Sequence, residues 1–96
     1  MRYRVNDMKT FTHSNLLEQG YRCTNIRTNR QYRKTVNTNV YIVINFEDNK
    51  GIFVFMLAHI PIHRYKKYIT DADTIKDIEK ELEWLITNKI IRKTLI

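Results

Sequence analysis

The fold is decided by two β-rich runs, VYIVINF at positions 40–46 and IFVFML at positions 52–57. The residues between them are polar and end in Gly51, which suits a tight turn that needs a left-handed backbone position. The pattern therefore predicts a central antiparallel β-hairpin.

The register of this hairpin has two alternatives. A three-residue loop places Ile42 and Ile44 on the same face as Val54, whereas a loop that differs by one residue aligns them with Phe53 and Phe55. In either register the second strand is apolar on both faces. Such a strand needs cover from helices or from another subunit, so a homodimer is one of the predicted arrangements.

Before the hairpin, a short helix is expected around residues 12–19. Leu16 and Leu17 give it an apolar side, and Gly20 suits a left-handed stop. The segment 21–34 is polar, β-branched and rich in arginine. It is interpreted as one or two solvated strands, or as a strand and a long loop.

After the hairpin, a long amphipathic helix is expected over residues 70–88. Asp71 and Asp73 offer a cap and a first-turn acid. Trp84 falls almost opposite the apolar stripe at about 100° per residue, and the other acidic residues are interpreted as a solvated face. The stripe recurs at spacings of three and four and consists of Ile75, Ile78, Leu82, Leu85 and Ile86.

Residues 1–96 are therefore expected to form one small α+β domain. Its 43% hydrophobic content is enough for one modest core. The predicted architecture is a short N-terminal helix, an antiparallel sheet of three or four strands around the hairpin, and a long C-terminal helix. This order resembles the topology of double-stranded-RNA-binding domains, but Lys66 and Lys67 precede the second helix, so no residue role is carried over.

The charge of the chain is unevenly placed. Residues 1–69 carry twelve Lys or Arg against four Asp or Glu, residues 70–88 carry two against six, and residues 89–96 add three basic groups. The formal net charge is +7. A regional positive field attracts polyanions or acidic partner surfaces and requires no catalytic group.

Two basic and aromatic clusters are candidate nucleic-acid-binding residues. Cationic groups neutralise phosphates, and tyrosine rings can stack on exposed bases. We expect the clusters to meet on one face and to bind DNA or RNA. The alternative is a solvated basic surface that only keeps the protein soluble. The first cluster consists of Arg22, Arg27, Arg30, Tyr32, Arg33 and Lys34, and the second of Arg64, Tyr65, Lys66 and Lys67.

Apolar residues without an obvious internal use support a second hypothesis, a protein-binding surface formed by Phe53, Phe55 and Trp84. Ile, Asn, Lys and Tyr are abundant, a composition typical of AT-rich genomes and of phages or mobile elements. The alternative function is therefore a protein inhibitor that docks on a host enzyme or on a host defence nucleoprotein, for example of the CRISPR type.

Catalytic motifs are missing from the sequence. Two glycines cannot make a phosphate-cradling loop, and His59 and His63 flank Pro61 without a nearby carboxylate. We therefore expect no enzyme activity, cofactor or metal. Cys23 is the only cysteine, and no run approaches the roughly eighteen apolar residues that span a bilayer. The expected location is the cytoplasm, that of the host if the protein is phage-encoded, with no membrane partner.

Overall fold

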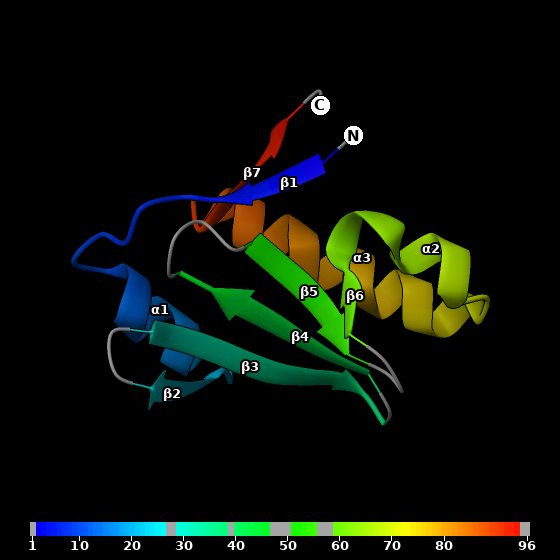
Figure 1. The fold of residues 1–96 in the computed structure, drawn as a ribbon, viewed down its shortest axis with the longest axis horizontal. Helices are drawn as coiled ribbons and strands as arrows, with labels where there is room; N and C mark the ends of the chain where they lie inside the picture. Colours follow the sequence, from blue (N-terminus) through cyan, green and yellow to red (C-terminus); the bar gives the residue numbers. More distant parts are fainter. Residues whose placement is uncertain (1, 27–28, 39, 47–50, 56–58, 95–96) are drawn as a thin grey trace.

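The computed structural model of the protein contains a run of consecutive strands, with a short helix before it and further helices after it (Figure 1). The described backbone covers residues 2–26, 29–38, 40–46, 51–55 and 59–94, and within it the side chains at 2, 25, 26, 29, 51–55 and 59 are not described. The elements are β1 (Arg2–Val5), α1 (Thr12–Glu18), β2 (Arg22–Ile26), β3 (Asn29–Asn37), β4 (Val40–Asn45), β5 (Gly51–Phe55), β6 (His59–Pro61), the 3-10 helix η2 (Ile62–Arg64), α2 (Tyr65–Tyr68), α3 (Ala72–Thr87) and β7 (Ile91–Thr94).

The predicted α+β class, with a short first helix and a long C-terminal helix, is confirmed. Strands β2 to β6 form a five-stranded antiparallel sheet in chain order, and β1 pairs with β7 in a second, two-stranded sheet. The larger sheet exceeds the three or four strands predicted. The arginine-rich segment 21–34 contributes to two strands, and a further short strand, β6, precedes η2.

The central hairpin places its residues on the faces expected for the first alternative, but its register is not that of a three-residue loop, because Asn45 is the Cα partner of Gly51. Ile42 is the Cα partner of Val54, and Ile44 is the partner of Ile52. Strand β3 pairs with β4 on the other side, with an irregularity between Thr35 and Asn37. The prediction of a hairpin at this place is therefore confirmed.

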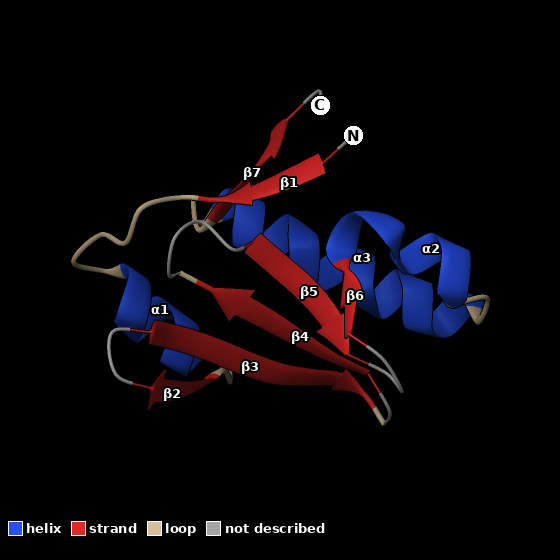
Figure 2. Ribbon diagram, in the orientation of Figure 1, coloured by secondary structure: helices blue, strands red, loops and turns tan. Residues whose placement is uncertain are grey.

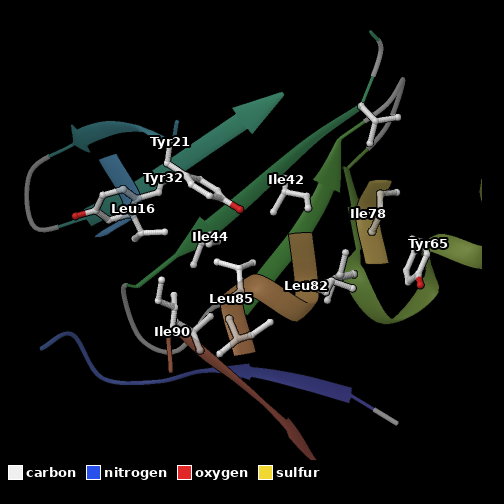
Figure 3. Packing of buried hydrophobic residues seen from close by; sticks show 14 of the residues in the cluster. Leu16, Tyr21, Tyr32, Ile42, Ile44, Tyr65, Ile78, Leu82, Leu85 and Ile90 are labelled. Atoms are coloured by element: carbon white, nitrogen blue, oxygen red, sulfur yellow. The ribbon is translucent and has the colours of Figure 1, made fainter. Parts of the chain in front are cut away.

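Helices α1 and α3 lie on the same side of the five-stranded sheet (Figure 2). Leu16 of α1 and Leu82 and Leu85 of α3 join Ile42 and Ile44 of β4 in one buried cluster (Figure 3). Each such aliphatic side chain contributes about 1.5–3 kcal/mol when it is fully buried. The core therefore contains the apolar side chains that alternate along β4 and those that recur every three or four residues along α3.

Helix α1 ends as the sequence predicts. Gly20 has φ +103°, its N–H donates to the Leu17 carbonyl at 3.1 Å, and the Tyr21 N–H donates to the Leu16 carbonyl at 3.0 Å. This is a Schellman motif, in which a left-handed residue satisfies the last carbonyls of the helix. Leu16 is fully buried, but Leu17 is 45% exposed, so only one of the two leucines expected on the apolar side reaches the core.

Helix α3 is held at both ends by hydrogen bonds. The Asp71 carboxylate accepts from the Thr74 hydroxyl at 2.6 Å and from the Thr74 N–H at 3.0 Å, and these bonds lower the pKa of Asp71. At the other end Lys89 takes the left-handed position with φ 60°. The Asn6 side chain donates to the Lys89 carbonyl at 2.8 Å, which ties the segment after β1 to the end of α3.

Candidate functional site

Strand alternation divides the first basic cluster between the two faces of the sheet. On β3, Tyr32 is buried in the core that α1 and α3 cover, and Lys34 points to the same side. Arg33 lies between them in the chain and therefore points to the opposite side. Adjacent residues of one sequence cluster are thus placed in two different environments.

The side opposite to α1 and α3 is named here the open sheet face. No described helix packs on it (Figure 2), and none of its described residues belongs to the hydrophobic core cluster. Val43, at its centre, is only 2% exposed. Its described residues are Arg22, Thr24, Gln31, Arg33, Thr35, Tyr41, Val43, Asn45 and Pro61.

Two exposed arginines lie side by side on the open sheet face. Arg22 of β2 and Arg33 of β3 are direct Cα partners across the strands. The Arg33 guanidinium carbon lies 4.8 Å from the centroid of the Tyr41 ring, a cation–π arrangement. Both arginines are basic residues that the sequence singles out, whereas Tyr41 carries no such signal, and alternation places it on the same face only once the β3–β4 register is known.

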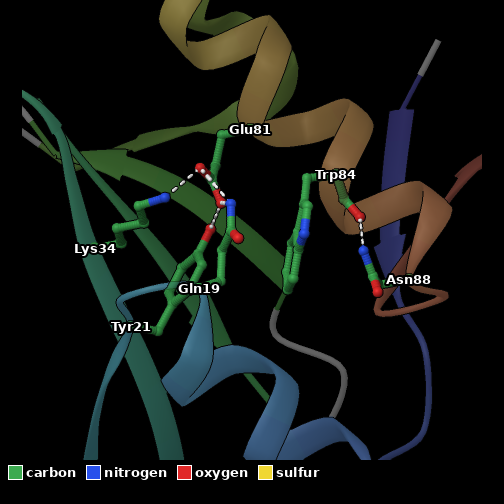
Figure 4. A network of polar contacts seen from close by, with 6 residues as sticks. All are labelled: Gln19, Tyr21, Lys34, Glu81, Trp84 and Asn88. Atoms are coloured by element: carbon green, nitrogen blue, oxygen red, sulfur yellow. Dashed lines mark hydrogen bonds and ion pairs between the residues drawn. The ribbon is translucent and has the colours of Figure 1, made fainter.

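Lys34 is part of a partly buried polar network on the other face (Figure 4). Its Nζ atom lies 2.6 Å from Oε1 of Glu81, a side chain that is only 7% exposed. The Tyr21 hydroxyl donates to Oε2 of Glu81 at 3.0 Å, and Gln19 Nε2 lies 3.4 Å from both carboxylate oxygens. Burial, reinforced by the Glu81 carboxylate, raises the pKa of Tyr21. Lys34 therefore stabilises the fold through its ion pair with Glu81, and the prediction that it contacts nucleic acid is wrong.

The position of Glu81 corrects the interpretation of α3 as having a purely solvated acidic face. Glu81 follows Ile78 by three residues and precedes Leu85 by four, so it lies on the edge of the apolar stripe. This spacing was visible in the sequence. Its partner Lys34 is 47 residues away in the chain, and only the tertiary structure places the two together.

Tyr32 is also withdrawn from solvent. Its side chain is fully buried, its hydroxyl lies 2.7 Å from Nδ1 of His13, and its ring packs edge-to-face on Phe46. Burial, with the Cys23 thiol beside it, raises the pKa of Tyr32 to about 12. The prediction that this ring is available to stack on bases is therefore wrong.

The remaining members of the first cluster are dispersed. Arg30 is exposed, but alternation places it on the side of Tyr32, where its Nη1 atom lies 3.8 Å from the sulfur of Met8. Arg27 lies outside the described residues. Among the described members of the original set, Arg22 and Arg33 therefore share the open sheet face.

The second cluster follows β6, the edge strand opposite to β2, on η2 and α2. Arg64, Lys66 and Lys67 are exposed, whereas Tyr65 is buried with 6% exposure. Burial, with Glu79 and Tyr3 nearby, raises the pKa of Tyr65 to about 12. The prediction that the Tyr65 ring is available to stack on bases is therefore wrong. The described residues of the two clusters lie toward opposite edges of the sheet, so the prediction that the clusters meet on one face is also wrong.

The residues predicted for protein binding have different outcomes. Trp84 is half-buried and packs against the core cluster, and Figure 4 places its indole on the side of α3 near Gln19. The helical phase predicted a solvated position for Trp84, whereas this flank of α3 is partly covered. The side chains of Phe53 and Phe55 lie outside those described, although their backbones pair with Val43 and Tyr41.

An open groove of about 950 Å³ lies between η2–α2, the β1–β7 sheet and the outer side of α3. Tyr3 and Leu82 are among its lining residues. Burial and the nearby Glu79 carboxylate raise the pKa of Tyr3. Its charges are mixed, because the lining includes Lys66, Lys76, Lys80 and Lys93 together with Glu79 and Glu83. A polyanion would meet both signs of charge here.

Comparisons with other proteins add no assignment. No family model, curated protein or solved structure matches this chain. Within the described part of the chain, no group of three or more His, Cys, Asp or Glu side chains could hold a metal ion. None of the described helices is both long and apolar enough to cross a membrane.

Proposed function

We propose that this protein is a non-catalytic nucleic-acid-binding protein and that its ligand lies on the open sheet face. The observation that carries the proposal is the pair Arg22 and Arg33, which are exposed and directly opposite each other on β2 and β3. Like charges directly opposite on a sheet destabilise it. Two guanidinium groups brought side by side at this place suit an anionic ligand, which would offset their mutual repulsion.

The regional charge of the chain agrees with this proposal. Residues 1–69 have an excess of eight basic groups, and the acidic residues of 70–88 lie mostly on α3, on the other side of the sheet. Phosphate groups are bound by Arg and Lys through a sequence-independent electrostatic attraction that salt weakens. The sheet face would therefore attract the phosphate backbone while α3 is turned away from it.

Salt-dependent binding tests this proposal. Fluorescence anisotropy with a labelled oligonucleotide of about 20 nucleotides should give binding that weakens between roughly 50 and 200 mM salt. The Arg22→Ala/Arg33→Ala variant should bind more weakly, and its log–log salt slope should fall by about 0.7–0.9 for each phosphate that is no longer neutralised. Lys66→Ala/Lys67→Ala is the matched control because it removes the same charge from the other edge of the sheet.

The control should bind more nearly like the parent protein than the arginine variant does. Equally weakened binding by both variants would mean that net charge, and not the open sheet face, determines binding. If no DNA or RNA bound in a salt-sensitive manner at low ionic strength, nucleic acid would be eliminated as the ligand.

A second candidate function is a protein inhibitor, encoded by a phage or mobile element, that docks on a host enzyme or on a host defence nucleoprotein in the cytoplasm. Phe11 and Leu17, at the start and near the end of α1, are 44% and 45% exposed and favour a protein partner. Replacement of both by Ser should abolish such an interaction and leave oligonucleotide binding unchanged. A homodimer and a single-domain organisation remain predictions.

A further inference from the structure

We infer that the ligand of the open sheet face is a single-stranded nucleic acid whose bases stack at the Arg33–Tyr41 pair. This inference rests on the proposed function and adds the class of nucleic acid to it. It is carried by the width of the sheet, the charge of the helices and the stacking of Arg33 on Tyr41.

The sheet is too wide to enter a groove of a duplex. Five strands span four interstrand spacings, or about 19 Å at about 4.8 Å each. The major groove of B-DNA is about 12 Å wide and admits one helix or a two-stranded ribbon. A duplex laid on this face would therefore touch it only through its phosphate backbone and would leave the base edges unread.

The described helices do not offer an alternative means of reading a duplex. Helix α1 (Thr12–Glu18) carries no Lys or Arg, and α2 (Tyr65–Tyr68) has only four residues. Helix α3 (Ala72–Thr87) is long enough, but its acidic residues outnumber its basic ones by five to two. A phosphate backbone beside a groove would be repelled by such a helix.

The Arg33–Tyr41 pair provides a surface on which an unpaired base can stack. The guanidinium lies 4.8 Å from the ring centroid, and both side chains belong to the open sheet face. Unpaired bases stack on tyrosine rings and on the planes of Arg guanidinium groups, whereas bases inside a duplex have no free face. Stacking at this pair therefore requires a single strand.

Polar side chains around the pair suit the rest of a nucleotide. Thr24 and Gln31 are direct partners across β2 and β3, and Thr35 is the partner of Tyr41. Their hydroxyl and amide groups can donate to and accept from base edges and sugars. Arg22, next to Arg33, would contact the phosphates on the way from β2 to β4.

The test compares single strands and duplexes of the same sequence. Labelled DNA and RNA 20-mers, each as a single strand and as a blunt duplex, are titrated with the full chain at one low salt concentration. We expect at least about tenfold tighter binding of one or both single strands than of either duplex. Preference for RNA over DNA, or the reverse, would identify the sugar and would support the inference in either case.

Two variants examine the stacking itself. Tyr41→Leu keeps the charge and an apolar side chain, and Arg33→Lys keeps the charge without the planar guanidinium. Each should weaken single-strand binding by about 5- to 100-fold, with the salt slope and the urea midpoint unchanged. Tyr41→Phe is the control, since it keeps the ring and should retain single-strand affinity.

Failure of the inference and failure of the proposed function have different signatures. Duplex binding as tight as single-strand binding, or full single-strand affinity in folded Tyr41→Leu and Arg33→Lys, would overturn the single-strand inference alone. If neither form of nucleic acid bound the parent protein, both proposals would fall. If Tyr41→Leu did not fold, Arg33→Lys would decide the result.

Discussion

Arg33 and Lys34 are neighbours in the chain and carry the same charge, yet strand β3 directs them to opposite faces of the sheet. Arg33 is exposed on the open sheet face, next to Arg22 and over Tyr41. Lys34 is paired with Glu81 at 2.6 Å on the face that α3 covers. The comparison teaches that a run of basic residues in a strand is divided by the two-residue period into charges that hold the fold and charges that a ligand can reach.

The largest expected effect is on the helix-covered face. Glu81→Ala removes the acceptor shared by Lys34 and Tyr21 and leaves a partly buried ammonium without its partner, so the free energy of unfolding should fall by about 3–5 kcal/mol. Urea denaturation followed by circular dichroism measures the decrease. Glu83→Ala on the exposed side of α3 is the control and should change stability by less than about 0.5 kcal/mol. Matching midpoints for the two variants would mean that the network does not hold the fold.

The next effect is a loss of stability at alkaline pH. Burial and Glu81 raise the pKa of the Tyr21 phenol above its ordinary value of about 10. Above about pH 10 the unfolded chain releases this proton while the folded chain retains it, so stability falls as pH rises. The slope that Tyr21 contributes is at most about 1.4 kcal/mol per pH unit.

Urea midpoints measured between about pH 8 and pH 11.5 examine this dependence. Tyr21→Phe should flatten the decline relative to the parent protein, whereas Tyr41→Phe on the open sheet face should leave it in place. An identical decline in the parent and in Tyr21→Phe would contradict the assigned environment of Tyr21.

A smaller effect is expected when the whole network is replaced by apolar groups. The triple variant Tyr21→Phe/Lys34→Met/Glu81→Leu removes donors and acceptor together and preserves most of the volume. Such replacements are often neutral or stabilising, so the free energy of unfolding should lie within about 1 kcal/mol of the parent value. Oligonucleotide binding should be retained, because the open sheet face is untouched. A stability as low as that of Glu81→Ala would mean that packing, and not the unpaired charge, determines the cost.

Elements whose signals are local in the chain could be predicted from the sequence. The apolar runs on either side of residues 47–51 predicted the hairpin, Gly20 predicted the end of α1, and Asp71 predicted the start of α3. Each of these depends on neighbours within a few residues. The α+β class followed from them.

The candidate site could be predicted only in part, because it depends on the register of β2, β3 and β4. Arg22 and Arg33 were found as basic residues, but a shift of one residue would have exchanged Arg33 with Lys34. Tyr32 was misjudged because its hydroxyl is satisfied by His13, 19 residues earlier in the chain. The partners of Glu81 come from the segment after α1 and from β3, which no pattern within α3 reveals.

The most direct test of the account replaces Arg33 and Lys34 separately by methionine. Arg33→Met and Lys34→Met each remove one positive charge, and each variant is measured twice, by urea denaturation and by anisotropy with a single-stranded oligonucleotide. Arg33→Met should bind about fivefold or more weakly, and its midpoint should change less than that of Lys34→Met, because its side chain is exposed on the open sheet face. Lys34→Met should lose about 1–3 kcal/mol of stability and bind as the parent does at temperatures where it is folded. Equal losses of affinity in the two variants, or a loss of stability in Arg33→Met matching that in Lys34→Met, would contradict the division of charge between the two faces of β3.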